Sequence, residues 1–160
     1  MDALEQQSGA LAGAEAVFVT LGTTRDAAGS AAAYRRVDLT FVDKAAAAAK
    51  AASVPQLLLL TSKGANARLW HSDHKLCHSL FYLHIKGAAE EAAAAHGFAH
   101  FSAFRPGMLD RGDAPTRSWA EAAAMRLLPT THVADVARAM IATAKRNAGK
   151  PAAPTAVYEL

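Results

Sequence analysis

Short apolar runs alternate with longer amphipathic segments along this chain of 160 residues. Residues 16–21 form a nearly continuous apolar run rich in β-branched side chains, which is typical of a strand buried on both faces. A second apolar run covers residues 56–61, and residues 99–104 alternate in polarity before they stop at Pro106. The pattern therefore predicts three strands over these ranges.

The segments between and after these runs have helical character. Residues 37–52 repeat apolar side chains on one side and place charged ones elsewhere, which predicts a helix. Further helices are predicted over residues 79–96, around 119–127 and over 132–146, and residues 158–160 are predicted as either a final strand or a tail. Strands separated by crossovers of helical length imply a parallel sheet of the α/β class.

Each predicted strand is followed by a polar loop that contains glycine. These loops cover residues 21–25, 61–64 and 105–108. Because ligands of parallel α/β sheets bind at the carboxyl ends of the strands, we expect the three loops to form one ligand-binding rim.

A tyrosine and a lysine lie four residues apart on the predicted helix of residues 79–96. At this spacing Tyr82 and Lys86 lie on one helical face. A lysine ammonium there favours the phenolate form of the tyrosine and so assists proton transfer, and it is also placed to reach the ribose hydroxyls of a dinucleotide. Ser62, at the end of the second strand, would polarise a substrate carbonyl. The alternative is a purely structural pair on an amphipathic helix.

Composition narrows the class of protein. Hydrophobic residues make up 52% of the chain and charged residues 19%, as in a globular protein, and the length predicts a single domain over residues 1–160. The net charge of +3 is spread without a dense basic block, which gives no support for nucleic-acid binding. Cys77 is the only cysteine and suggests a reducing compartment. With no secretory signal and no apolar run of membrane-spanning length, we expect a cytoplasmic protein.

Six segments together resemble the short-chain dehydrogenase/reductase superfamily, and most of all its atypical, oxidoreductase-like Tat-interacting protein branch. They span most of the chain, from about residue 15 to 146, in the order found in the family. The segments are residues 21–25 (Leu-Gly-Thr-Thr-Arg), 34–38, 59–65 (Leu-Leu-Thr-Ser-Lys-Gly-Ala), 81–87, 104–107 (Phe-Arg-Pro-Gly) and 133–137.

The resemblance implies a Rossmann-like parallel sheet with flanking helices that binds NADP(H) or NAD(H). Tyr82 and Lys86 match the catalytic pair of the family, and Ser62 matches its serine position, beside a second hydroxyl on Thr61. The implied cofactor-binding residues are Leu21, Gly22, Thr23, Thr24, Lys86, Arg105, Pro106 and Gly107. For Arg105, a salt bridge to a neighbouring side chain is an equally good interpretation.

One departure from the family concerns the phosphate-binding turn. The family opens with a strand and a Gly-x-x-Gly-x-x-Gly turn that meets the pyrophosphate at a helix N-terminus. The sequence has no such motif, since Gly9 and Gly13 follow no strand. We therefore expect a partial, N-terminally truncated Rossmann-like domain with an exposed sheet edge, either a shortened relative or a fragment of a longer polypeptide.

Other candidate residues receive structural interpretations. His71, His74, Cys77 and His78 have metal-ligand character, but we expect a polar loop and no metal site. Asp38 is interpreted as a helix-starting residue with a capping role. Asp135 is expected to fix its local loop. Trp70 and Trp119 are expected to pack in the interior, with the wall of a substrate pocket as the alternative.

Two functions remain open from the sequence. The first is an NAD(P)(H)-dependent oxidoreductase that acts on a small carbonyl or alcohol substrate, with the cofactor supplying the hydride chemistry. The alternative is a non-catalytic regulatory member of the same family that binds a protein partner, with homo-oligomerisation also open. A partial gene product with neither activity is the third interpretation.

Overall fold

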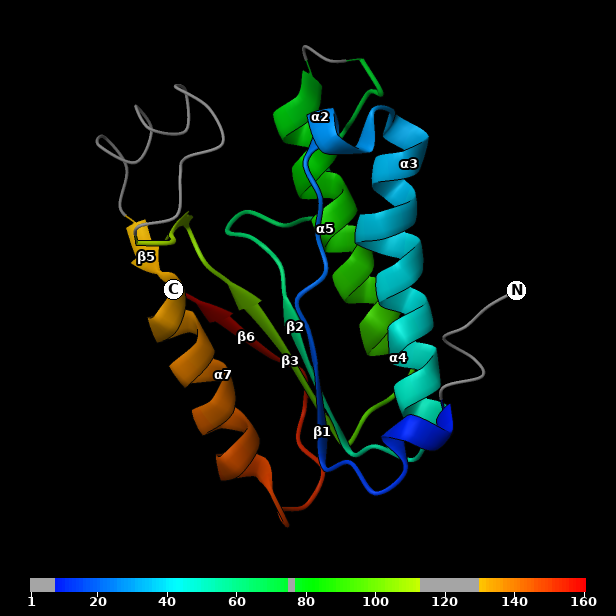
Figure 1. Cartoon of the computed structure of the whole chain (residues 1–160), viewed down its shortest axis with the longest axis vertical. Coiled ribbons are helices and arrows are strands. Elements are labelled where there is room, and N and C mark those ends of the chain that lie inside the picture. Colours follow the sequence, from blue (N-terminus) through cyan, green and yellow to red (C-terminus); the bar gives the residue numbers. More distant parts are fainter. Residues whose placement is uncertain (1–7, 75–76, 113–129) are drawn as a thin grey trace.

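Four parallel strands form the main sheet, in the order β1–β2–β3–β6 (Figure 1). The computed structural model describes residues 8–74, 77–112 and 130–160. The strands are β1 (Ala16–Val19), β2 (Gln56–Leu60), β3 (His100–Arg105) and β6 (Ala156–Glu159). Every pairing is parallel, with Leu57 beside Val17 on one side and Phe101 on the other. The predicted α/β class with a Rossmann-like parallel sheet is confirmed.

Helices cover both faces of this sheet. Figure 1 shows α4 (Phe41–Ala51) and α5 (His78–Ala95) on one side and α7 (Val133–Asn147) on the other. The alternation along β2 explains why the run is apolar throughout, because Leu57 and Leu59 pack toward α4 and α5 whereas Leu58 packs with α7. The continuous leucine run is thus the signature of a strand buried on both faces.

The helix predicted over residues 37–52 begins earlier than expected. It runs from α3 (Ala31–Arg35) through a π-helical turn, η2 (Arg36–Thr40), into α4. Ser30 starts this run, since its hydroxyl accepts a hydrogen bond from the backbone N–H of Ala33 at 3.1 Å. The interpretation of Asp38 as a helix-starting cap is therefore wrong, because two further turns of helix precede it.

The remaining elements lie close to their predicted positions. A 3-10 turn, η1 (Ser8–Leu11), precedes β1, and the short helix α2 (Arg25–Ala28) follows it. The segment predicted as a strand or a tail is the strand β6, where Tyr158 stacks on Phe104. Two short strands, β4 (Met108–Asp110) and β5 (Thr130–His132), pair beside the main sheet. The helix predicted around residues 119–127 lies outside the described residues.

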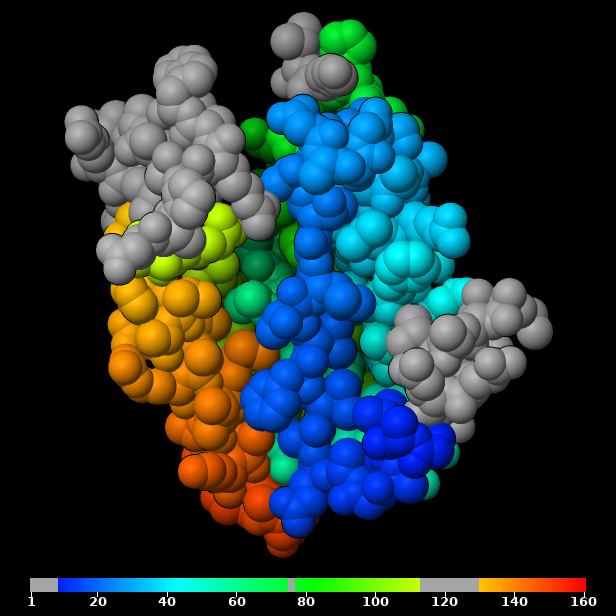
Figure 2. Space-filling view, in the orientation of Figure 1, coloured from blue at the N-terminus to red at the C-terminus, as the bar shows by residue number. Residues whose placement is uncertain are grey.

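The β1 strand lies at the edge of the sheet. Within the described residues it pairs with β2 alone, and the space-filling view shows it at the surface (Figure 2). Phe18 is 43% exposed there, beside a largely apolar cavity of about 300 Å³ between β1, η1 and α4, so the prediction that this strand is buried on both faces is wrong. Among residues 8–74, 77–112 and 130–160, no helix combines the length and the apolar character needed to cross a bilayer.

Candidate active site

A cavity of about 260 Å³ lies at the carboxyl ends of β1 and β2, between the loop that follows β1 and helix α5. It combines apolar and polar walls, with hydroxyl groups, one carboxylate and two basic side chains. Its lining residues are Thr20, Leu21, Gly22, Thr23, Thr24, Asp38, Leu60, Thr61, Tyr82, Lys86, Leu109 and Arg111. The strand ends thus bring together the loop of residues 21–24 and the Tyr82–Lys86 pair, although they lie about sixty residues apart in the sequence.

Helix α5 presents Tyr82 and Lys86 to this cavity from successive turns. Phe81 and Ile85 are buried against α3, so the next residue along the helix in each turn lies at the cavity. The ammonium nitrogen of Lys86 lies 5.9 Å from the centre of the Tyr82 ring. The pair is therefore one side of a common wall, as its spacing predicts.

A close backbone approach fixes the height of α5 relative to the β2 end. Gly87 faces the chain at residues 66–67, where an added Cβ would lie 2.2 Å from the backbone nitrogen of Ala67. The backbone N–H of Asn66 also donates to the carbonyl oxygen of Leu83 at 3.0 Å. Glycine is required at position 87 because only a residue without a side chain permits this contact.

Lys86 forms a buried ion pair with Asp38. Its Nζ lies 2.7 Å from Asp38 Oδ1, and the two side chains are 9% and 0% exposed. The second carboxylate oxygen, Oδ2, accepts a hydrogen bond from the backbone N–H of Thr23 at 2.9 Å. Gly22 lies directly over the pair, since a Cβ there would meet Asp38 Oδ1 and Lys86 Nζ at 3.4 Å each. Asp38 therefore belongs to the site.

The sequence contained a signal for this placement of Asp38. Tyr34, Asp38, Val42 and Ala46 recur every four residues, and all four are fully or almost fully buried. A carboxylate on such a stripe requires a buried partner, and Lys86 supplies it. Burial first, and then the negative charge of Asp38, raise the pKa of Tyr34 above its ordinary value, so the phenol beside the pair is neutral.

The two hydroxyl residues at the end of β2 have different surroundings. Thr61 lines the cavity, is buried, and donates its hydroxyl hydrogen to Glu90 Oε1 at 2.5 Å. Ser62 is partly exposed, and its hydroxyl makes a long contact of 3.4 Å with the carbonyl oxygen of Lys63. Ser62 does not line the cavity, so the structure brings Thr61 rather than Ser62 to the Tyr82–Lys86 wall.

Arg105 has a buried partner of its own. It donates from Nε to Glu90 Oε1 at 3.0 Å and from Nη2 to Glu90 Oε2 at 2.6 Å, in a two-pronged ion pair. This contact raises the pKa of Arg105 above its ordinary value. Arg105 does not line the cavity beside Lys86. Of its two interpretations, the neighbouring salt bridge is the one that the structure contains.

Pro106 and Gly107 connect strand ends. The carbonyl oxygen of Pro106 accepts a hydrogen bond from Lys63 N at 2.9 Å, and the N–H of Gly107 donates to Leu160 at 3.1 Å. Pro106 thus links the end of β3 to the loop after β2, and Gly107 links it to the residue after β6, both outside the cavity lining. Their cofactor contacts, like those of Arg105, stay predictions.

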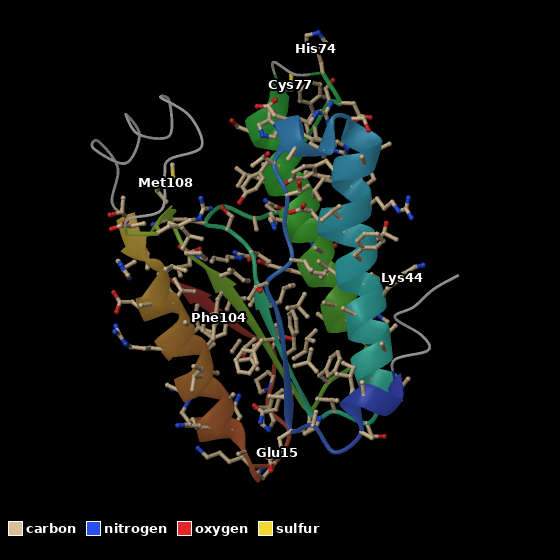
Figure 3. The ribbon with its side chains drawn as sticks, viewed as in Figure 1. Glu15, Lys44, His74, Cys77, Phe104 and Met108 are labelled. Atoms are coloured by element: carbon tan, nitrogen blue, oxygen red, sulfur yellow. The ribbon has the colours of Figure 1, made fainter. Side chains whose placement is uncertain are left out.

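The histidine-rich segment does not line this cavity, although the His78 ring lies 6.4 Å from the ring of Tyr82. Figure 3 shows His74 and Cys77 at the N-terminal end of α5, whereas Met108 marks the carboxyl end of the sheet. His71 stacks on His84 with ring centres 3.7 Å apart, and burial, followed by the nearby His71, lowers the pKa of His84. In the part of the chain that the structure describes, no three metal-ligating side chains converge.

The other side chains with structural interpretations differ in outcome. Trp70 is 70% exposed, so the prediction that it packs in the interior is wrong. Asp135 lies in the first turn of α7, where it pairs with Arg138 at 2.5 Å, a local structural role. Trp119 lies outside the described residues.

The sequence profile of the NAD(P)H-binding family matches residues 1–147 of this chain. The chain is 36% identical over 118 residues to Protein HTATIP2 of Rattus norvegicus, which covers 72% of this chain and 45% of that protein. It is also 40% identical over 94 residues to Protein FMP52-1, mitochondrial, of Scheffersomyces stipitis, covering 59% of this chain and 38% of that protein. The matches thus span less than half the length of these relatives. The cytoplasmic location stays a prediction.

Solved structures share the fold. MoeE5 in complex with UDP-glucose and NAD superimposes with a TM-score of 0.68 at 20% sequence identity. The match covers 96% of this chain and 58% of that one. At this identity the similarity concerns the fold, and it agrees with the parallel sheet and its two helical layers.

Proposed function

The chain belongs to the NAD(P)H-binding family, and from this premise we propose that its rim cavity holds the nicotinamide end of NADP(H) or NAD(H) for hydride exchange with a carbonyl or alcohol substrate. The observation that carries the proposal is that Tyr82 and Lys86 line one cavity together with the loop of residues 21–24. One cavity thereby contains a group for proton transfer, a group for ribose binding and a backbone loop close to the ligand.

The residues present fit one end of the dinucleotide. A cavity of about 260 Å³ lies near the lower limit of ligand pockets, roughly 300–1,000 Å³, so it suits one end of the molecule rather than the whole. Lys86 and the threonine hydroxyls supply polar groups for a ribose, and Leu21 and Leu109 supply apolar walls for a ring. The sequence offers no Gly-x-x-Gly-x-x-Gly turn for the pyrophosphate.

The protein's part in the chemistry is proton transfer and orientation. The cofactor, when bound, supplies or accepts the hydride. Tyr82 would donate its hydroxyl proton to the oxygen of a carbonyl that is being reduced, or accept the proton of an alcohol that is being oxidised. Lys86 would donate hydrogen bonds to the ribose hydroxyls. Ser62 does not line the cavity, so its role of holding the substrate oxygen stays a prediction from the sequence. Thr61 lines the cavity, but it already donates its hydroxyl hydrogen to Glu90.

The test is a fluorescence titration of the 160-residue chain with NADPH and NADH, followed by turnover with a panel of aldehydes and ketones. We expect Tyr82→Phe to lower turnover about a hundredfold or more while leaving nucleotide affinity within twofold. Tyr158→Phe is the matched control, because its hydroxyl binds Arg146 on the α7 side of the sheet, and it should keep full activity.

Three outcomes separate the candidate functions. Binding with turnover that depends on Tyr82 supports the oxidoreductase. Binding without turnover on any substrate supports the regulatory alternative. No binding of either nucleotide refutes the proposal for this chain.

A further inference from the structure

We propose that Asp38 is a positioning residue, which holds the Lys86 ammonium and the Gly22–Thr23 loop in fixed relation at the cavity. The catalytic consequence of this positioning rests on the proposed function. The positioning does not, because it involves only side chains and backbone of this chain. The proposal starts from the fact that one fully buried carboxylate contacts two separate parts of the rim.

The two oxygens of Asp38 have different partners. Oδ1 lies 2.7 Å from Lys86 Nζ on α5, and Oδ2 accepts from the backbone of Thr23 at 2.9 Å. The Thr23 contact ties down the loop that follows β1, and the Lys86 contact orients the ammonium. Asp38 thus holds two segments that both line the cavity.

The helix that carries Asp38 gives it little freedom to move. Asp38 lies within the π-helical turn η2, between Tyr34 and Val42, which are also buried. π-Turns inside α-helices are rare and frequently accompany functional sites. Because a buried carboxylate without a partner is costly, the pair with Lys86 is maintained whenever this part of the chain is folded.

The pairing also determines what Lys86 can offer a ligand. An ammonium has three N–H donors, and an ion pair with one carboxylate oxygen leaves donors for the cavity that Lys86 lines. The lysine charge is balanced by Asp38, so the pair contributes no net charge to the ligand. Lys86 therefore acts as an oriented hydrogen-bond donor rather than as a general attractor of anions.

The first test needs no cofactor. The rate at which acetic anhydride labels Lys86 is followed by mass spectrometry in the wild-type chain and in Asp38→Asn. Removing the carboxylate leaves the Lys86 amine without its ion-pair partner and free to move, so labelling should accelerate at least about tenfold. Asp43→Asn is the matched control, since Asp43 lies in α4 on the same helix run as Asp38 but pairs with His96 at the end of α5, and the substitution should leave the rate unchanged.

Circular dichroism verifies that each variant is folded. If Asp38→Asn does not fold, Asp38→Glu takes its place, because it keeps the charge and moves the carboxylate by one methylene. Its labelling rate should lie between the wild-type rate and the rate expected for Asp38→Asn, at least about threefold above wild type. A rate within twofold of wild type in the folded variant overturns the proposal.

The second test measures NADPH affinity in a double-mutant cycle with Lys86→Gln. Asp38→Asn should weaken binding about tenfold to a hundredfold, and it should add no further loss when Lys86 is already glutamine. Additive losses would show that Asp38 does not act through Lys86. If the wild-type chain binds neither nucleotide, the proposed function fails, while the labelling experiment still decides the positioning.

Discussion

Arg105→Met should destabilise the fold without disturbing the rim cavity. Arg105 forms two contacts with the carboxylate of Glu90, at 3.0 and 2.6 Å, and the two side chains are 22% and 9% exposed. The substitution keeps much of the side-chain volume and removes the guanidinium. Glu90 is then left buried with the Thr61 hydroxyl as its remaining partner among these contacts.

The magnitude follows from burial. Removing one partner of a buried ion pair costs about 3–5 kcal/mol, and the partial exposure of Arg105 favours the lower end, about 3 kcal/mol. For a chain of this length each kcal/mol lowers the melting temperature by roughly 2–4 °C, so a decrease of roughly 6–12 °C is expected.

Urea and thermal unfolding followed by far-UV circular dichroism measure this change. Arg138→Met is the matched control, because Arg138 pairs with Asp135 at 2.5 Å with both side chains largely exposed. It should change the unfolding free energy by less than about 0.5 kcal/mol. If the two variants are equally stable, or if Arg105→Met changes nucleotide affinity more than stability, the structural role of Arg105 is refuted.

Two further predictions concern α5 and its histidine. Gly87→Ala should destabilise the chain by about 1–3 kcal/mol in urea unfolding, because its Cβ would lie 2.2 Å from Ala67 N, whereas Gly9→Ala meets no neighbour and should be nearly neutral. Acidification from pH 7 to 5 should lower the unfolding free energy through His84, whose pKa is lowered from 6.5 by burial and then by His71, so that the unfolded state binds more protons. His84→Gln should flatten that slope, and an unchanged slope would contradict the assignment.

Strand patterns were readable from the sequence because burial dictates them directly. The leucine run of β2 packs on helices at both faces, which accounts for its composition. The similar run over residues 16–21 predicts the same burial, but β1 lies at the edge of the described sheet and is partly exposed. The ends of the helices were harder to predict from the sequence. The helix over residues 37–52 begins six residues earlier, at Ala31, because a capping serine and alanines carry it and no strongly apolar residue marks its first turn.

The candidate site was predictable where spacing within one element decides it. Tyr82 and Lys86 share a helical face by geometry, and the loop of residues 21–24 follows its strand directly, so both reach the predicted rim. Asp38 was misinterpreted because its partner lies 48 residues away, on another helix. Local sequence patterns predict caps and turns, but they do not reveal an ion pair between residues that are far apart in the sequence.

Helix α5 shows why such long-range pairs matter for the site. Lys86 and Glu90 are four residues apart with opposite charges, a spacing at which side chains on an isolated helix can pair with each other. In the fold each instead pairs with another element, Lys86 with Asp38 on η2 and Glu90 with Arg105 on β3. Two successive turns of α5 are thereby fixed, one to the neighbouring helix run and one to the sheet, with Gly87 held between them against the chain at residue 67. Tyr82 lies one turn before Lys86, so its position at the cavity follows from the contacts of Lys86, Gly87 and Glu90 rather than from its own.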